Sequence, residues 1–349
     1  MTLNASGPIS LAGTTAGQSI EKELGGTGTS QISLNCSTVR TLAGVPSGAI
    51  VMPTNFYGKS NGNTAPTAMF YGGYTTSYTN KVTRINKCGA LIGTETSVGT
   101  ARGLLAGATS GAKGIYFGGC AGTGSVNTVT RINFCGALVG SETNAGTARS
   151  SLAGATVSTY GLFYAGGLAC SPYNLVTRIN CAGALVGSET SVGTKRTTLA
   201  GAPVGGNGMF YGGYAITCLC YCVATQYKLV TRINSSGALV GSETSVGTPV
   251  SCEAGAFIGT KGIFYGGLGL TNTVTRINCA GAIVGSQTTV GTARKFLGGA
   301  SPCSTAVFYA GCSGAISSTV TRINTCGALI GSQSTVGTAR TYIAGGATQ

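Results

Sequence analysis

The stretch Val129-Thr-Arg-Ile-Asn133 decides the fold, because this five-residue string occurs six times in the chain. Its copies begin at Val82, Val129, Val176, Val230, Val274 and Val320. Successive copies lie 47, 47, 54, 44 and 46 residues apart. Self-similarity with a period of roughly 20–50 residues is the signature of a repeat architecture, in which each unit buries its apolar face against its neighbours.

Each unit repeats a longer text that contains four short segments. In the second unit we expect strands at Gly103–Ala108, Ile115–Gly119, Val129–Asn133 and Ala137–Thr143. Most of these segments are rich in Val, Ile, Thr, Tyr or Phe, and all are bounded by Gly or Asn. The 3.6-residue periodicity of a helical repeat is absent. About 46 residues and four strands per unit is the size of a β-propeller blade, so we predict an all-β fold.

The two ends of the repeat region complement each other. Residues 69–73 read as a second strand with no first strand before it, whereas residues 338–346 read as a first strand with no second after it. Pairing them would close a ring and remove an open sheet edge. We therefore predict a six-bladed propeller over residues 64–349, closed by the C-terminal strand, with a small anchor segment at residues 1–63.

Composition argues against an enzyme. The chain has no His, and all seven of its acidic residues are Glu. Ser-His-Asp triads, Cys-His dyads and HExxH zinc sites are therefore impossible. Four of the Glu residues fall one per repeat, which should hold them too far apart for two-carboxylate glycoside hydrolysis. We expect no catalytic residue, no metal site and no cofactor.

The net charge of +14 suggests nucleic acid as a ligand, but the placement of Arg disfavours it. Arg recurs in the third strand at Arg84, Arg131, Arg178, Arg232, Arg276 and Arg322. It recurs again in the segment that joins one unit to the next, which we call the blade link, directly after Thr-Ala or Thr-Lys. These link Arg residues are Arg102, Arg149, Arg196, Arg294 and Arg340. The fourth strand carries Glu95, Glu142, Glu189 and Glu243, replaced by Gln287 and Gln333 in the last two units. We expect these side chains to pair within or between blades. Six equivalent binding sites are the alternative. The fifth unit has Pro249-Val250 where the others have the link Arg.

Sequence variation collects in the loops between the second and third strands, which strand alternation places on one face of the ring. Variable loops on a uniform scaffold are where binding resides, although neutral drift explains them equally well. The candidate contact residues are Tyr78, Tyr173, Tyr214, Tyr221 and Tyr227. The longest loop carries Cys218, Cys220 and Cys222, whose spacing on a strand is too wide for one tetrahedral zinc. Most Cys residues are expected to be free, small and buried.

The repeat resembles a Kelch-type propeller unit. The resemblance rests on the double glycines Gly72-Gly73, Gly118-Gly119, Gly166-Gly167, Gly212-Gly213 and Gly266-Gly267. The sixth unit has Ala310-Gly311-Cys312 instead, and the Trp of that family's repeat is missing throughout. The resemblance implies a protein-binding propeller, but some Kelch propellers are oxidases, so it does not fix the function.

Residues 1–63 lack the repeat and carry a second resemblance. We expect short helices at residues 19–24 and 39–44. The residues expected to mediate docking are Ile20, Leu24, Val39, Leu42, Phe56 and Tyr57. The sequence at residues 17–20, 44–50 and 56–60 is similar to that of the N-terminal module of tailed-phage virion proteins, especially cyanophage-like ones. This resemblance implies attachment to the particle, with the propeller displayed outward.

Together these features predict a phage virion structural protein of the tail fibre, baseplate or neck. Its expected partners are other virion proteins, bound through residues 1–63, and a glycan or protein of the host surface. Several copies per particle are expected, because virions are built on rotational symmetry. A cellular Kelch-like adaptor and a carbohydrate-binding propeller are the alternatives. We expect no signal peptide, no membrane insertion and no nucleic acid as main ligand, with assembly in the host cytoplasm.

Overall fold

The computed structural model describes residues 3–12, 14–15, 18–23, 33–34, 37–43, 45, 48–57, 67–111, 113–122, 124–168, 171–218 and 222–347. The chain divides into two compact units, Met1–Ala65 and Pro66–Gln349. The expected boundary between residues 63 and 64 lies outside the described residues.

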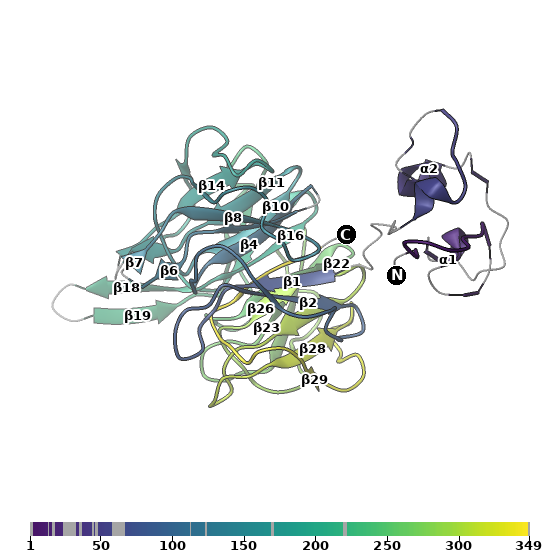
Figure 1. The fold of residues 1–349 in the computed structure, drawn as a ribbon. Coiled ribbons are helices and arrows are strands. Elements are labelled where there is room, and N and C mark those ends of the chain that lie inside the picture. The colour runs from purple at the N-terminus through teal and green to yellow at the C-terminus, as the bar shows by residue number, and fades with distance from the viewer. Residues whose placement is uncertain are drawn as a thin grey trace. The chain divides into compact units, whose positions relative to one another are not determined.

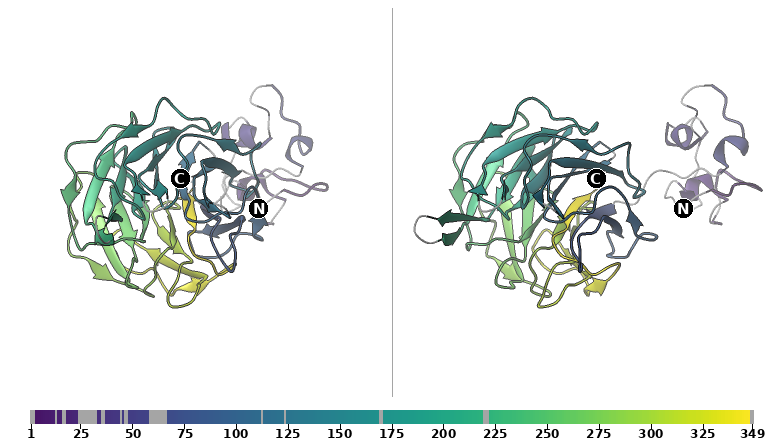
Figure 2. Two further views of the ribbon diagram at one scale, coloured as in Figure 1. Left: turned by 90° about the vertical axis from the view of Figure 1, so that its left-hand side faces the viewer. Right: turned by 60° about the vertical axis from the view of Figure 1, so that its left-hand side comes forward.

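The second unit is a six-bladed β-propeller in which each blade is a four-stranded antiparallel sheet (Figure 1 and Figure 2). From the innermost strand outward, the first three blades are β30 (Ala344–Ala347), β1 (Thr67–Tyr71), β2 (Lys81–Asn86) and β3 (Thr96–Ser97); β4 (Ala106–Ser110), β5 (Lys113–Phe117), β8 (Thr128–Asn133) and β9 (Thr143–Asn144); β10 (Ala153–Val157), β11 (Tyr160–Tyr164), β14 (Leu175–Ile179) and β15 (Thr190–Ser191). The last three are β16 (Ala200–Val204), β17 (Asn207–Tyr211), β20 (Leu229–Ile233) and β21 (Thr244–Ser245); β22 (Ala254–Ile258), β23 (Lys261–Tyr265), β24 (Thr273–Asn278) and β25 (Thr288–Thr289); β26 (Gly298–Ala300), β27 (Ala306–Tyr309), β28 (Thr319–Ile323) and β29 (Ser334–Thr335). We number these blades 1 to 6.

Blade 1 combines the two ends of the propeller. Strand β30 pairs antiparallel with β1, in a register that sets Ala68 opposite Ala347 and Tyr71 opposite Ala344. Figure 2 shows the yellow end of the chain beside the dark blue start of the propeller. The inner edge of β1 is therefore covered by a strand from the far end of the chain.

Six backbone hydrogen bonds form a closed circle around the central channel. The six residues that make it, which we call the ring residues, are Leu104, Ser151, Thr198, Cys252, Phe296 and Tyr342. Each N–H donates to the carbonyl of the ring residue in the preceding blade, at N···O distances of 2.7 to 3.0 Å. Their φ angles lie between 52° and 63°, a region in which non-glycine residues are uncommon. The circle links each blade to the next at the start of its innermost strand.

Glycines bring the six innermost strands together just beyond this circle. They are Gly107, Gly154, Gly201, Gly255, Gly299 and Gly345. A Cβ atom added to any of them would lie 2.1 to 2.4 Å from the carbonyl oxygen of the glycine in the neighbouring blade. The strands therefore approach as closely as backbone atoms allow. This explains why each unit has Gly at the position of Gly107 in the sequence Leu105-Ala-Gly-Ala108.

The second strand of each blade is buried on both faces, because it lies between two other blades. In β11, Phe163 packs on Phe117 of blade 2 with ring centres 5.3 Å apart, and Tyr164 packs on Phe210 of blade 4 at 5.1 Å. Both are fully buried. This explains why adjacent aromatic residues replace the alternating pattern of a half-exposed strand.

Three of the four strands expected in the second unit have bounds that are wrong by two residues or more. Strand β4 begins at Ala106 rather than Gly103, because Leu104 belongs to the hydrogen-bonded circle. The double glycines after β5 lie outside the strand, with φ angles of 68° and 99°. Most of residues 137–142 form no strand, since Asn133 Oδ1 accepts the N–H groups of Cys135 and Ala137 in a turn and Gly140 has a φ of 66°. Only Thr143–Asn144 pairs as the fourth strand, β9.

The first unit contains α1 (Ile20–Glu23), α2 (Ser37–Ala43) and a 3₁₀ turn at Thr54–Phe56. Its apolar cluster buries Ile20, Val39, Leu42 and Phe56, which are four of the residues expected to mediate docking. Tyr57 packs against the same cluster, and Leu24 lies outside the described residues. These buried side chains stabilise the unit itself, so an attachment surface must use its exposed residues.

Candidate functional site at the central channel

The variable loops and the circle of ring residues lie on the same face of the propeller. Antiparallel bridges join the residue before a ring residue to the base of a variable loop at Gly103–Cys120, Ser150–Gly167, Thr197–Tyr214, Lys295–Cys312 and Thr341–Tyr74. In three blades the loop forms a hairpin, made of β6 (Cys120–Ala121) and β7 (Gly124–Ser125), β12 (Gly167–Leu168) and β13 (Ser171–Pro172), and β18 (Tyr214–Cys218) and β19 (Cys222–Gln226). Figure 1 shows the last hairpin projecting from the propeller. We call this side the loop face.

The central channel has a cavity on each side of the glycines. The cavity toward the loop face has a volume of about 110 Å³ and is lined by all six ring residues. The opposite one is about 50 Å³ and is lined by the far ends of the innermost strands, including Thr109, Pro203 and Phe257. Both volumes are small, so a ligand at either end would insert one side chain or sugar substituent rather than enter completely.

The ring residues differ in every blade, although the text around them is nearly constant. Phe296 and Tyr342 stack with their ring centres 4.4 Å apart, and Lys295 Nζ lies 5.5 Å from the centre of the Phe296 ring. Ser151 and Thr198 bring small polar side chains to the circle in blades 3 and 4. The cavity at the loop face is therefore asymmetric, aromatic on one side and hydroxyl-bearing on another.

Further tyrosines extend the aromatic side. Tyr74 and Tyr78 pack edge to face with ring centres 5.5 Å apart. A hydrogen bond with Cys120, followed by burial, raises the pKa of Tyr78 to about 12. Burial, followed by the proximity of Cys252, Cys312, Tyr214 and Tyr74, raises the pKa of Tyr342. We name Tyr74, Tyr78, Tyr214, Phe296 and Tyr342 the aromatic cluster. The phenols of Tyr78 and Tyr342 stay protonated at neutral pH and can donate hydrogen bonds.

The structure brings together only part of the tyrosine set expected from the sequence. Tyr78 and Tyr214 belong to the aromatic cluster. Tyr173 and Tyr227 lie where their loops meet the following blade link, since their carbonyl oxygens accept the N–H groups of Arg196 and Val250 at 3.2 and 3.1 Å. The charge of Arg149 interacts with the phenol of Tyr173, and no described contact joins either tyrosine to the aromatic cluster. Tyr221 lies outside the described residues. Sequence reasoning missed the ring residues, whose signal is a variable position two residues after the link Arg.

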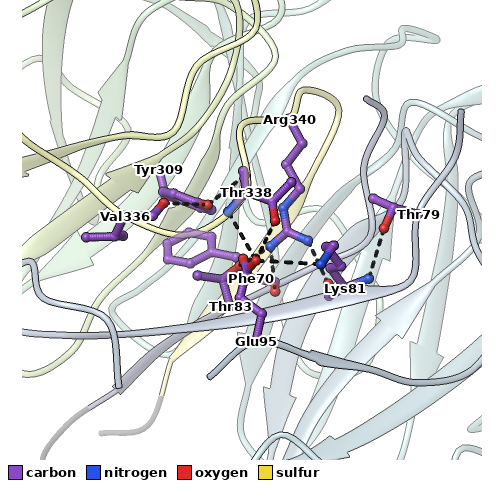
Figure 3. A network of polar contacts seen from close by, with 9 residues as sticks. All are labelled: Phe70, Thr79, Lys81, Thr83, Glu95, Tyr309, Val336, Thr338 and Arg340. Carbon is purple, nitrogen blue, oxygen red and sulfur yellow. Dashed lines mark hydrogen bonds and ion pairs between the residues drawn. The ribbon is translucent and has the colours of Figure 1, made fainter. Parts of the chain in front are cut away.

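The link Arg residues form clamps with Glu residues, each of which lies one residue before the fourth strand rather than in it, where the sequence had placed it. In blade 1, Arg340 donates to the carbonyl oxygens of Lys81 and Phe70 at 2.8 and 3.4 Å and hydrogen-bonds Thr83 (Figure 3). Glu95 hydrogen-bonds the same Thr83. The Glu95 carboxylate also accepts the N–H and hydroxyl of Thr338, from the preceding blade link, at 3.1 and 2.5 Å. The clamp therefore joins neighbouring blades.

Blades 2 to 4 repeat the clamp with an ion pair. Arg102, Arg149 and Arg196 lie 3.9, 2.9 and 3.5 Å from carboxylate oxygens of Glu142, Glu189 and Glu243. Burial alone would raise the pKa of Glu189, but hydrogen bonds from Thr147 and Thr177 and the charge of Arg149 hold that pKa below its ordinary value. The pKa values of Glu95, Glu142 and Glu243 are lowered in the same way.

The third-strand Arg residues do not pair with Glu. Arg131 and Arg276 donate to the carbonyl oxygens of Ser141 and Ser286 in their own blades, at 2.8 and 3.0 Å. Arg178 and Arg232 reach carbonyl oxygens in the turn of the next blade, at 3.4 Å. Arg84 and Arg322 hold the equivalent strand positions in blades 1 and 6. Among the described ion pairs, the expected Arg–Glu pairing is therefore confirmed for Arg102, Arg149 and Arg196. Arg294 and Arg340 instead share Thr321 and Thr83 with Gln333 and Glu95.

The expectation that most cysteines are buried is wrong for the described residues. Of the nine cysteines whose environment is described, all are free and only Cys252 is buried. Six are exposed, namely Cys88, Cys135, Cys181, Cys279, Cys303 and Cys326. Five of these lie in the turn after the third strand. Among the described residues, no three His, Cys, Asp or Glu side chains are grouped as metal ligands.

These features define a six-bladed β-propeller with a variable, partly aromatic opening on one face. No protein-family model matches the chain, and no curated protein is significantly similar to it. Within the described residues, no helix is long and apolar enough to cross a membrane.

Proposed function

We propose that the protein is a non-enzymatic structural protein of a tailed-phage virion, in which residues 1–63 attach the chain to the particle and the propeller binds a partner through its loop face. One observation carries the binding role. The residues that distinguish six otherwise similar blades, the ring residues and the variable loops, are gathered around one opening of the channel. A scaffold maintained only for stability has no need of this concentration.

The chemistry of the opening favours a protein or a glycan of the host surface as the partner. Tyr and Phe present large, rigid surfaces and are enriched in binding interfaces. The phenols of the aromatic cluster add hydrogen-bond donors, and Lys295 adds a positive charge at its edge. A sugar ring or an apolar side chain stacked on Tyr342, with a substituent in the cavity of about 110 Å³, satisfies all three features.

The absence of catalysis is supported by how four of the five Glu residues of the propeller are used; the fifth, Glu253, is buried and lines the loop-face cavity. Glu95, Glu142, Glu189 and Glu243 are each committed to a clamp between blades, where Thr hydroxyls and Arg hold them ionised. They are structural anions on the scaffold, away from the channel cavities, whose lining contains none of them.

The virion assignment rests on the wording shared between residues 1–63 and the N-terminal modules of tailed-phage proteins. The first unit has its own buried cluster, as a module that precedes different display domains requires. Several copies per particle and assembly in the host cytoplasm follow from this assignment. A cellular Kelch-like adaptor and a lectin are the competing functions.

Attachment is tested by deleting residues 1–63 in the phage genome and measuring the protein in purified particles by mass spectrometry. We expect loss from particles, while the purified propeller keeps its β-sheet circular dichroism spectrum. A reciprocal fusion of residues 1–63 to a fluorescent protein should enter particles. Normal incorporation of the deletion variant would refute the attachment role.

Binding through the loop face is tested with Phe296→Ser/Tyr342→Ser, measured as adsorption of labelled protein to host cells and to a glycan array. The matched control is Phe257→Ser, which removes an aromatic residue at the opposite opening. We expect the double variant alone to lose adsorption. Binding to glycans without host cells favours the lectin, and equal adsorption by both variants contradicts a loop-face site.

A further inference from the structure

Blade 5 departs from the other blades at the position of the link arginine. The other blades carry a fully buried Arg there, namely Arg102, Arg149, Arg196, Arg294 and Arg340. Blade 5 has Val250, and a cavity of about 40 Å³ lies beside this shorter side chain. A cavity of this size with polar walls is large enough to hold more than one water molecule.

The cavity takes the place that the guanidinium occupies elsewhere. In blade 6, Arg294 donates to the carbonyl oxygens of Ala310 and Thr319 at 2.6 and 2.7 Å, hydrogen-bonds Thr321, and lies 5.8 Å from the ring centre of Tyr265. The counterparts of these four residues in blade 5 are Gly266, Thr273, Thr275 and Tyr211, and all four line the cavity. The groups that surround a guanidinium in blade 6 are thus kept in blade 5.

A buried carboxylate also faces this cavity. Glu253 stands where the other blades have Leu105, Leu152, Leu199, Leu297 and Ile343, and it lines the cavity. Only 7% of Glu253 is exposed, and neither of its carboxylate oxygens has a hydrogen-bond partner of good geometry. The hydroxyl oxygen of Thr271, another lining residue, is buried without a partner as well. Buried polar groups without partners are rare and costly.

The lining has the character of a site for a hydrogen-bond-donating cation. Glu253 offers two carboxylate oxygens, and hydroxyl and carbonyl oxygens surround them. The cation that acts on Glu253 is Arg196, whose Nη1 donates to the carbonyl oxygens of Gly212 and Leu229, both at 2.9 Å, while its buried Nε has no partner. Burial raises the pKa of Glu253 to about 8, against the opposing effects of the Glu253 amide, Arg196 and the Ala200 amide, which is the behaviour of a carboxylate that lacks a counter-ion.

We propose that blade 5 binds a guanidinium group, free in solution or at the tip of a partner's arginine, between the carboxylate of Glu253 and the hydroxyl of Thr275. A planar guanidinium donates in a fork that matches a carboxylate, which a spherical ammonium cannot reproduce. Pro249 and Leu268, both exposed, form part of the cavity wall. The site is therefore adjacent to solvent on the propeller surface.

The test is a calorimetric titration of the full chain with methylguanidinium chloride, compared with methylammonium chloride at equal ionic strength. We expect saturable binding of methylguanidinium that is about tenfold or more tighter than that of methylammonium. Glu253→Gln should weaken it about tenfold or more while the fold is kept. Val250→Arg should abolish it, because the new side chain restores the blade's own guanidinium, and should raise the midpoint of thermal unfolding.

Affinity should also increase with pH, from about pH 6.5 to about pH 9, as Glu253 ionises. The other groups facing Glu253 are the charged Arg196 and the titratable Tyr211 and Cys252. Tyr211 and Cys252 stay protonated over this range, since burial raises the pKa of Cys252 to about 11 and raises that of Tyr211 as well. An acetylated Gly-Arg-Gly amide distinguishes the sources, because its binding assigns the site to a partner's arginine and its failure assigns it to the free ion. Absence of methylguanidinium binding to the wild type, or undiminished binding to Val250→Arg, would overturn the proposal.

Discussion

Replacing Arg149 by Met should destabilise the propeller more than the same replacement of Arg294. Both arginines are fully buried and occupy equivalent positions in blades 3 and 6. Arg149 lies 2.9 Å from the carboxylate of Glu189, whereas the equivalent partner in blade 6 is the neutral Gln333. Met keeps the apolar volume of the side chain, so the comparison isolates the loss of the guanidinium.

The magnitude follows from what each replacement leaves behind. Without Arg149, Glu189 keeps its bonds from Thr147 and Thr177 but loses its counter-ion. Breaking a buried pair in this way costs about 3–5 kcal/mol, and since the Glu189 side chain is 14% exposed we expect about 3 kcal/mol. Without Arg294, only neutral acceptors lose a donor, for about 1–2 kcal/mol. The difference should therefore be about 1–2 kcal/mol.

Urea unfolding of the purified chain, followed by circular dichroism, measures both values under one set of conditions. A third variant, Glu189→Gln, recreates the neutral pair of blade 6 within blade 3 and should cost about 1 kcal/mol or less. If Arg294→Met proves as costly as Arg149→Met, hydrogen bonding to backbone carbonyls rather than ion pairing holds the blades together, and the reasoning from the carboxylate fails.

Three further predictions concern the channel, acid stability and the thiols. Gly154→Ala should lower the free energy of unfolding by about 3 kcal/mol or more, because its Cβ would lie 2.3 Å from the Gly107 oxygen. The control Gly111→Ala, with open space around its Cβ, should lower it by about 1 kcal/mol. Equal losses of stability in urea unfolding would contradict the packing argument. The clamp carboxylates have lowered pKa values in the folded state. Their contribution to stability is therefore complete above the unfolded pKa of about 4.3 and is lost as pH falls through the folded pKa values. A propeller that unfolds at the same urea concentration at pH 3 as at pH 6 would refute this. Exposed thiols should react with a thiol reagent in the native state before Cys252 does, and early labelling of Cys252 in peptide maps would show that the channel opens.

The repeat made the blades predictable, but contacts between blades were not. The six VTRIN copies mark the third strands, and the incomplete units at the two ends predict that β30 belongs beside β1, as their register shows. The start of the first strand depends on a bond between Leu104 and Tyr342, which are separated by most of the chain. The strand propensity of the residues around Leu104 does not predict a bond to a residue so far along the chain. The double glycines of blades 1, 2, 4 and 5 have strand-like neighbours, and only their positive φ angles place them outside the strand. In blade 3 the two residues with positive φ are Ala165 and Gly166, and Gly167 begins β12.

The candidate site was predictable to a similar degree. Aromatic residues in variable loops drew attention to Tyr78 and Tyr214, which do flank the opening. Tyr173 and Tyr227 could not be told apart from them, because which loop tyrosines meet the ring residues depends on packing between blades rather than on local sequence. The ring residues could not be predicted, because each is one variable residue within a nearly constant sequence. Their shared position is recognised only from the closed circle of hydrogen bonds between blades.

Blade 5 breaks the six-fold symmetry of the propeller at two neighbouring positions. Its changes are coupled, because Val250 removes a buried cation and Glu253 introduces a buried anion beside the space that results. Either change alone leaves a defect that the other five blades avoid, a cavity in one case and an unpaired charge against Leu packing in the other. Together they replace a buried cation by a titratable carboxyl group while keeping the acceptors that recognise a guanidinium. On the loop face, Phe296 of blade 6 lies next to this altered blade, since its N–H donates to the carbonyl of Cys252 at 2.9 Å.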